Sequence, residues 1–190
     1  MREKDPNKVD AIYKATLKLV LREGFSGLKM SEVAKEAKVA TGTLYLYFEN
    51  KEDLISQLYL ALKQQSTAGI LKEYDSKAPF MVNFEKIWKA AVAVQLKSPE
   101  AAAFHEQYYR SPYVKASVKQ EIDKLWLPVM ELIEQGKKER LLKDVPTELL
   151  LLQIIGLMNE LVRQHHANMI KATQELINTA FEMTWDGIKR

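Results

Sequence analysis

Apolar residues recur every three or four positions along most of this 190-residue chain. That spacing places them on one face of an α-helix, because a helix completes a turn in about 3.6 residues. Glycine and proline, the residues that interrupt helices, number only seven and six. These features predict an all-α protein, which the prolines and candidate caps divide into about nine helices.

The composition excludes several classes of protein. The strongest apolar run, residues 149–158, is shorter than the roughly 20 residues that a membrane span needs. The amino terminus, MREKDPNK, has no apolar stretch of the kind that forms a signal peptide. Cysteine is absent, which excludes disulfides, thiolate metal ligands and a cysteine nucleophile. We expect a cytoplasmic protein that has no membrane partner.

The predicted helices fall into two groups. A helix at 6–23 is followed by two short helices, at 30–37 and 41–48, with three residues between them. A longer helix over 51–74 leads into the second group, in which Pro128 predicts a kink in a helix over 113–139. We therefore expect a small domain at residues 1–50 and a larger helical domain at residues 51–190.

Two short helices joined by a tight turn form the helix-turn-helix motif of DNA-binding proteins. On a helix over 41–48, Leu44 and Phe48 lie one turn apart and face the core, whereas Thr41, Tyr45 and Tyr47 face away. Such a tyrosine can pack along a sugar-phosphate backbone and donate its hydroxyl to a phosphate. The net charge is only +3, so DNA binding would depend on this local arrangement. From these residues alone, a hydrophobic turn between two core helices remains the alternative.

Residues 23–55, EGFSGLKMSEVAKEAKVATGTLYLYFENKEDLI, resemble the DNA-binding domain of TetR-family transcriptional regulators. The matching positions are Gly24, Phe25, Val33, Ala34, Ala37, Val39, Gly42, Thr43, Leu44, Tyr45, Tyr47, Phe48, Lys51, Glu52 and Leu54. The resemblance implies a three-helix DNA-binding domain, a connecting fourth helix and a helical ligand-binding and dimerisation domain. It also implies a homodimeric repressor that a small-molecule effector releases from a palindromic, double-stranded DNA operator. Activation in place of repression stays open.

The resemblance assigns the DNA contact to a small set of residues. Phosphates would be held by Thr43, Tyr45, Tyr47 and Lys51, and bases would be approached by Thr41, Gly42 and Ser31. Lys38 stands in the turn, where the family often has glycine, and either takes up strain or directs a positive charge at DNA.

Two further positions depart from the family pattern. Ala40 replaces the common serine or threonine before the recognition helix, which makes Thr41 the candidate cap. Met30 stands where many members have a phosphate-binding threonine, which leaves that contact to Ser31 or to backbone N–H groups.

The large domain carries residues suited to an effector pocket, which combines apolar walls with a few polar groups. Ordinary helix packing is the alternative for each of them. The candidates are Trp88, Phe104, His105, Tyr108, Trp126, Met130, Met158 and Asn159.

Residues 149–162 predict a helix that is apolar around nearly its whole circumference, and such a helix needs partners on both sides. The helix predicted after it, over 173–188, carries a second wide apolar stripe. Pairing with their copies in a second chain would give a four-helix interface, and burial within one chain is the alternative. The interface candidates are Leu150, Ile154, Leu161, Ile177, Phe181 and Trp185.

No metal, cofactor or catalytic site is expected. The stretch FHEQYYR at 104–110 lacks the second histidine of the two-histidine zinc motif, and the adjacent His165 and His166 point about 100° apart on a helix. No nucleophile elbow or phosphate loop occurs. We predict that the chain is not an enzyme. The alternative function is a helical ligand- or partner-binding protein that does not bind DNA.

Overall fold

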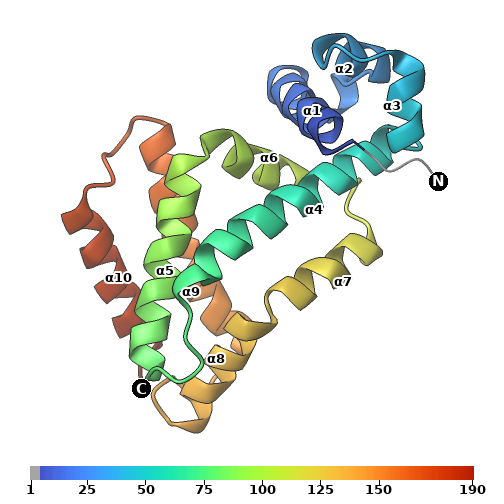
Figure 1. Cartoon of the computed structure of the whole chain (residues 1–190). Helices are drawn as coiled ribbons and strands as arrows, with labels where there is room; N and C mark the ends of the chain where they lie inside the picture. The colour runs from blue at the N-terminus through green and yellow to red at the C-terminus, as the bar shows by residue number, and fades with distance from the viewer. Residues whose placement is uncertain (1–4) are drawn as a thin grey trace. The chain divides into compact units, whose positions relative to one another are not determined.

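The computed structural model describes residues 5–190, which form ten α-helices and one 3₁₀ turn. No strand occurs in this part of the chain, so the all-α prediction is confirmed, with one helix more than expected. The elements are α1 (Pro6–Gly27), α2 (Met30–Glu36), α3 (Thr41–Tyr47), α4 (Lys51–Ile70), η1 (Leu71–Glu73), α5 (Phe80–Lys97), α6 (Pro99–Tyr109), α7 (Ala116–Leu125), α8 (Leu127–Lys138), α9 (Thr147–His166) and α10 (Gln174–Ile188) (Figure 1).

The chain folds into two compact units. The N-terminal unit contains the residues up to Lys63 together with the segment Glu100–Ile122, and the C-terminal unit contains Gln64–Pro99 and Asp123–Arg190. Helices α4 and α7 therefore contribute residues to both units. The predicted domain boundary at residue 50 lies inside the N-terminal unit, and α6 joins that unit instead of the large domain.

Helix α1 begins where the sequence indicated. The Asp5 carboxylate accepts a hydrogen bond from the Asn7 backbone N–H at 3.0 Å, and Pro6 occupies the first turn. Near its end the helix is interrupted at Gly24, where φ is 71°, a value that glycine adopts with little strain. The interruption redirects the chain so that Phe25 is buried in the core.

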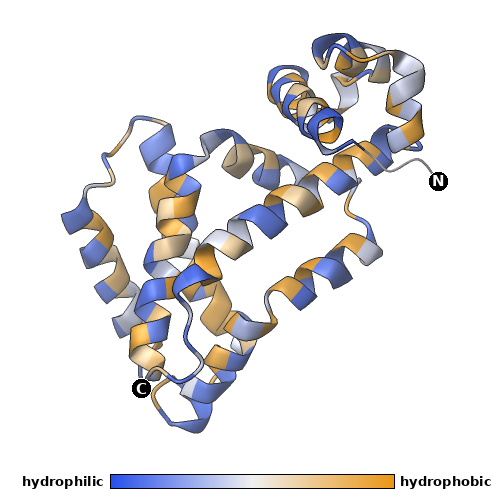
Figure 2. Cartoon of the chain, viewed as in Figure 1, coloured by the Kyte–Doolittle hydropathy of each residue, from blue (hydrophilic) through white to orange (hydrophobic). Residues whose placement is uncertain are grey.

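One apolar cluster, drawn from α1, α2, α3, α4 and α6, is the core of the N-terminal unit. Hydrophilic and hydrophobic residues are interleaved along α1 and α4 (Figure 2), as the sequence pattern predicted. The buried members are Ile12, Ala15, Leu19, Val20, Phe25, Leu28, Met30, Val33, Ala34, Leu44, Phe48, Leu54, Ile55, Leu58, Phe104 and Tyr108.

Helix α5 is central to the C-terminal unit, because α8, α9 and α10 all pack against it (Figure 1). The Trp88 indole N–H donates to the Ile154 carbonyl at 3.2 Å, which ties α5 to α9. A short antiparallel bridge between Leu142 and Lys189 holds the end of α10 against the connection that follows α8.

The long helix predicted over 113–139 is broken in two. Helix α7 ends at Leu125, Trp126 has φ −93° and ψ 0°, and Pro128 lies in the first turn of α8. Proline lacks an N–H group, and inside a helix its ring clashes with the preceding turn. A break before Pro128 removes that clash completely, whereas a kink would only reduce it.

Candidate nucleic-acid interface

The α2–α3 segment has the geometry of a helix-turn-helix. After α2, the Val39 N–H donates to the Ala34 carbonyl at 2.9 Å, and Lys38 adopts a left-handed conformation with φ 55°. The strain predicted at Lys38 is therefore present, since a side chain in this region costs about 1 kcal/mol. Lys38 also lines a groove between α1 and α2, together with Lys14 and Lys18.

The prediction that Thr41 caps α3 is wrong. Ala40 occupies the N-cap position without a side-chain hydrogen bond, and Thr41 is the first residue of the helix. The reason is local, because the Leu44 N–H already finds the Ala40 carbonyl at 3.2 Å. Thr41 is therefore an exposed residue in the first turn of α3, and its hydroxyl does not cap the helix.

Helix α3 is anchored by Leu44 and Phe48, which expose 0% and 1% of their surfaces. Phe48 also contacts the ring of Tyr13, with 5.8 Å between the ring centroids. The face away from this anchor is open to solvent and includes Thr41, Gly42, Tyr45 and Leu46, whereas Thr43 and Tyr47 are half-buried at its edge. Ser31, on α2, is exposed as well.

Tyr47 connects α3 to the start of α1. Its hydroxyl oxygen accepts a hydrogen bond from the Asp5 backbone N–H at 3.2 Å. A hydroxyl that accepts at its oxygen can still donate its proton, so this contact is compatible with donation to a phosphate.

Lys51 has a structural role that the sequence did not indicate. Its ammonium group donates to the Phe25 carbonyl at 3.3 Å and lies 5.9 Å from the centre of the Tyr113 ring. An ammonium has three donors, so a phosphate contact would have to use those that remain. The assignment of Lys51 to a phosphate stays a prediction.

Three of the residues predicted to line the effector pocket belong to the N-terminal unit. Phe104 and Tyr108 expose 0% and 1% of their surfaces and contact Phe25 edge to face at 5.5 and 6.4 Å. Tyr108 stacks on Tyr59 at 3.9 Å, and its hydroxyl donates to the Tyr113 carbonyl at 3.0 Å. These two side chains are core residues that fasten α6 to the end of α1, a role their local sequence does not reveal.

His105 differs from its two neighbours in the pocket set. Its ring meets Tyr59 edge to face at 5.4 Å, and its buried Nε2 atom has no hydrogen-bond partner among the described residues. Burial, assisted by the nearby Lys63 ammonium, lowers the pKa of His105 to about 3, so the ring is neutral at pH 7. Burial also lowers the pKa of Lys63 and raises that of Tyr59 to about 12.

The other five pocket candidates lie in the C-terminal unit, and they do not share one environment. Trp88 and Met158 are buried in the core, Trp126 and Met130 are half-buried, and Asn159 is exposed. The structure therefore divides the predicted lining between two units.

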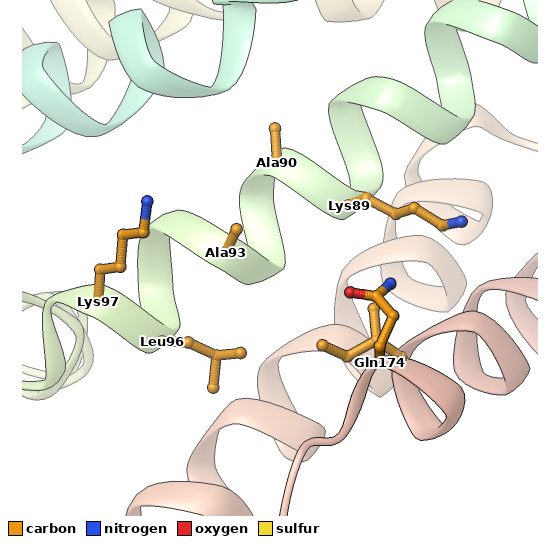
Figure 3. Close-up of a pocket in the computed structure, with 7 residues that line it drawn as sticks. Lys89, Ala90, Ala93, Leu96, Lys97 and Gln174 are labelled. Atoms are coloured by element: carbon orange, nitrogen blue, oxygen red, sulfur yellow. The ribbon is translucent and has the colours of Figure 1, made fainter.

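A groove in the C-terminal unit runs between α5 and the start of α10 and has a volume of about 580 Å³ (Figure 3). None of the eight pocket candidates lines it. Lys89, at one end, is paired with Glu85 at 2.6 Å. The lining residues are Lys89, Ala90, Ala93, Leu96, Lys97, Gln174 and Ile177.

The residues predicted to form a dimer interface are used in the core of their own unit. Leu150, Ile154, Leu161 and Phe181 expose 9% or less of their surfaces, and Ile177 and Trp185 pack partly buried against the same cluster. When apolar residues surround a helix, the sequence pattern does not distinguish the side that packs in its own subunit from the side that is left exposed. The exposed apolar residues of α9 and α10 are Leu149, Leu152, Ile155, Leu176 and Met183.

Within residues 5–190, no three histidine, aspartate or glutamate side chains gather as metal ligands would. Across the same residues, no helix has both the length and the apolar character needed to cross a membrane.

Two family models match the chain. Residues 12–58 match the model described as bacterial regulatory proteins, tetR family. Residues 79–189 match the model described as Tetracyclin repressor-like, C-terminal domain. Together the two models cover both the helix-turn-helix and most of the remaining helices.

Similar proteins extend over the whole chain. An uncharacterized HTH-type transcriptional regulator from Haemophilus influenzae is 28% identical over 191 residues, covering 100% of both chains. The crystal structure of a TetR family transcription regulator from Marinobacter aquaeolei VT8 superposes with a TM-score of 0.92 at 26% identity, over 100% of this chain and 99% of that one. A tetR family transcription regulator from Shewanella sp. PV-4 gives a TM-score of 0.86 at 30% identity, over 96% and 98% of the two chains. All three are named as regulators of transcription and none as an enzyme.

Proposed function

The chain belongs to the TetR family and is a helix-turn-helix transcriptional regulator, and we propose that it acts as a homodimeric repressor in the cytoplasm. In this proposal the dimer binds a palindromic operator and leaves it when a small molecule binds. The observation that carries the proposal is the outer face of α3, where Thr41, Gly42 and Tyr45 are exposed above a buried anchor of Leu44 and Phe48.

The recognition helix would lie in the major groove with its first turn toward the bases. Tyr45 and Tyr47 lie on opposite flanks of α3, since residues two positions apart on a helix are separated by about 200° around its axis. Each hydroxyl would donate to a phosphate on its own side of the groove, and Thr43 would support the contact near Tyr47. These contacts fix the register of the helix, whereas Thr41, Gly42 and Ser31 would lie near base edges.

Dimerisation would use the apolar residues that the subunit leaves uncovered. Leu149, Leu152 and Ile155 recur at intervals of three on α9, and Leu176 and Met183 lie seven apart on α10. The two helices pack on each other within one chain, so pairing with a second copy would give a four-helix arrangement. Twofold symmetry then predicts two half-sites about 34–36 Å apart, or a multiple of that distance.

Release by a small molecule requires a ligand that binds one state more tightly than the other. Helix α6 supports such a coupling, because Phe104 and Tyr108 share a core with Phe25 at the end of α1. A ligand that satisfied the unpartnered Nε2 of His105 and displaced α6 would disturb that core. We therefore propose that His105, and not Phe104 or Tyr108, is the residue of α6 that contacts the effector.

The proposed DNA contact can be tested with purified protein and a labelled duplex of mixed sequence. Fluorescence anisotropy over a salt series should show an affinity that falls steeply as salt rises, because bound phosphates release counterions. Tyr45→Ala should weaken binding, and Tyr109→Ala is the matched control, since Tyr109 is 80% exposed on α6 of the same unit. If the two variants bind alike, α3 is not the contact. If the wild type shows no salt-dependent binding, the alternative of a protein that does not bind DNA is favoured.

A further inference from the structure

Helix α3 carries a leucine on its solvent-exposed side that the contacts described so far do not use. Leu46 exposes 79% of its surface, more than Tyr45 beside it at 53%. Exposing a large apolar side chain forgoes roughly 25 cal/mol for each Å² that could be buried. The rest of the N-terminal unit leaves this side chain uncovered.

The position of Leu46 around the helix is fixed by the two anchors. Leu44 and Phe48 are buried, and Leu46 lies two residues from each, which places it about 160° from both. It therefore projects directly away from the core, with Tyr45 on one flank and Tyr47 on the other. In a helix docked through those tyrosines, Leu46 would face the floor of the groove, one turn beyond Gly42.

Gly42 lies one turn before Leu46 on α3, so the two residues form one strip on the side of the helix that faces away from the core. A Cβ atom built at Gly42 meets nothing within 4 Å, so packing within the protein does not require glycine there. Glycine in an exposed helix costs about 1 kcal/mol relative to alanine. A residue that lowers helix stability without a packing reason is expected where another molecule must approach the backbone closely.

The major groove offers a leucine one apolar partner. Base edges present hydrogen-bond donors and acceptors, and the exception is the C5-methyl group of thymine. From this geometry we propose that Leu46 is a specificity-determining residue that contacts a thymine methyl group in each operator half-site. The inference rests on the proposed function, because it requires α3 to lie in the major groove.

Replacement of thymine by deoxyuridine removes only the methyl group, so it isolates this contact. The operator is first recovered by selection from random duplexes, and each thymine is then replaced in turn, symmetrically in both half-sites. Wild-type protein should lose about fourfold in affinity per half-site at one thymine position, the value expected for one buried methyl-sized group. Leu46→Ala should lose less than twofold at that position.

Two control variants make the comparison specific. Tyr109→Ala, at a site 80% exposed on α6 and outside the proposed DNA contact, should give the wild-type affinity and the wild-type deoxyuridine profile. Gly42→Ala should raise the melting temperature yet weaken operator binding, because it adds a methyl group to the strip that faces the bases. Circular dichroism of Leu46→Ala checks the fold, which a residue exposed by 79% should not disturb.

The outcomes separate the inference from the function on which it rests. An operator whose thymines can all be replaced without loss would overturn the assignment of Leu46 and leave the regulator intact. Equal losses in wild type and Leu46→Ala would overturn it too, since the methyl contact would belong to another residue. A wild-type protein that selects no sequence would overturn both.

Discussion

Lys38 is the residue at which the backbone of the helix-turn-helix is least relaxed. Its φ of 55° is accessible to glycine and unfavourable for a residue with a Cβ atom. We predict that Lys38→Gly raises the free energy of unfolding by about 1 kcal/mol, measured by urea denaturation.

The matched control is Lys35→Gly, which removes the same side chain from a helical position in α2. There the entropy of glycine dominates, and the free energy of unfolding should fall by about 1 kcal/mol. Changes of the same sign in both variants would contradict the account of strain at Lys38.

His105 should make the stability of the protein depend on pH. Its pKa is about 3 in the folded chain, where burial and then Lys63 oppose protonation, against about 6.5 when the chain is unfolded. Between these values the unfolded state binds more protons, so the free energy of unfolding falls as the pH is lowered through this window. From pH 7 to pH 5 we expect a loss on the order of 1–2 kcal/mol.

The control for this prediction is His105→Phe, which keeps a ring against Tyr59 but cannot be protonated. Urea denaturation at pH 7 and pH 5 should show a smaller loss in the variant, because the phenyl ring takes up no proton when the chain unfolds. Identical losses would mean that His105 is protonated as readily in the folded chain as in water.

For single residues, the sequence predicted which side chains are buried or exposed better than it predicted which groups they contact. The spacing of Leu44 and Phe48 was sufficient to place them in the core and to leave Thr41 and Tyr45 outside. The partner of Lys51 could not be predicted, because the Phe25 carbonyl is 26 residues away in the sequence and follows a break in α1 at Gly24.

Helix α6 is the element whose position differs most from the prediction. Phe104, 0% exposed, packs on Phe25, so Phe104→Ala should lower the free energy of unfolding by about 3–5 kcal/mol. Tyr109→Ala, at a site 80% exposed on the same helix, should change it by less than about 0.5 kcal/mol. Chemical denaturation, monitored by circular dichroism, measures the free energy of unfolding of both variants. A small effect of Phe104→Ala would instead favour a place for Phe104 in the lining of a ligand pocket, because loss of the ring there would enlarge an open pocket and leave no buried cavity.

The existence and order of most helices followed from periodicity, whereas their packing did not. The pattern of α6 shows an apolar face, but it does not say that the face meets α1 instead of α5. The same limit applies to α9, whose apolar residues surround the helix. In both cases the information lies in contacts between distant parts of the chain, which a local pattern does not contain.

At the scale of the whole molecule, the exposed apolar residues of α9 and α10 predict the assembly state. Leu152 is 71% exposed, so Leu152→Glu should leave the subunit folded while placing a charge in the proposed interface. We expect the wild type to be a dimer and this variant a monomer by light scattering coupled to size-exclusion chromatography. Val82→Glu, at a site 42% exposed on α5, is the control and should remain a dimer. A dimeric Leu152→Glu would place the interface elsewhere.

We propose that α3 reads a DNA sequence as part of a symmetric dimer. The most direct test is selection of duplexes from a random pool by wild-type protein, with Tyr45→Ala and Tyr109→Ala selected in parallel. We expect a palindromic consensus for the wild type and for Tyr109→Ala, and a weak consensus or none for Tyr45→Ala. A folded wild-type dimer that enriches no sequence at low salt would contradict it, as would a Tyr45→Ala variant that recovers the same palindrome with undiminished strength.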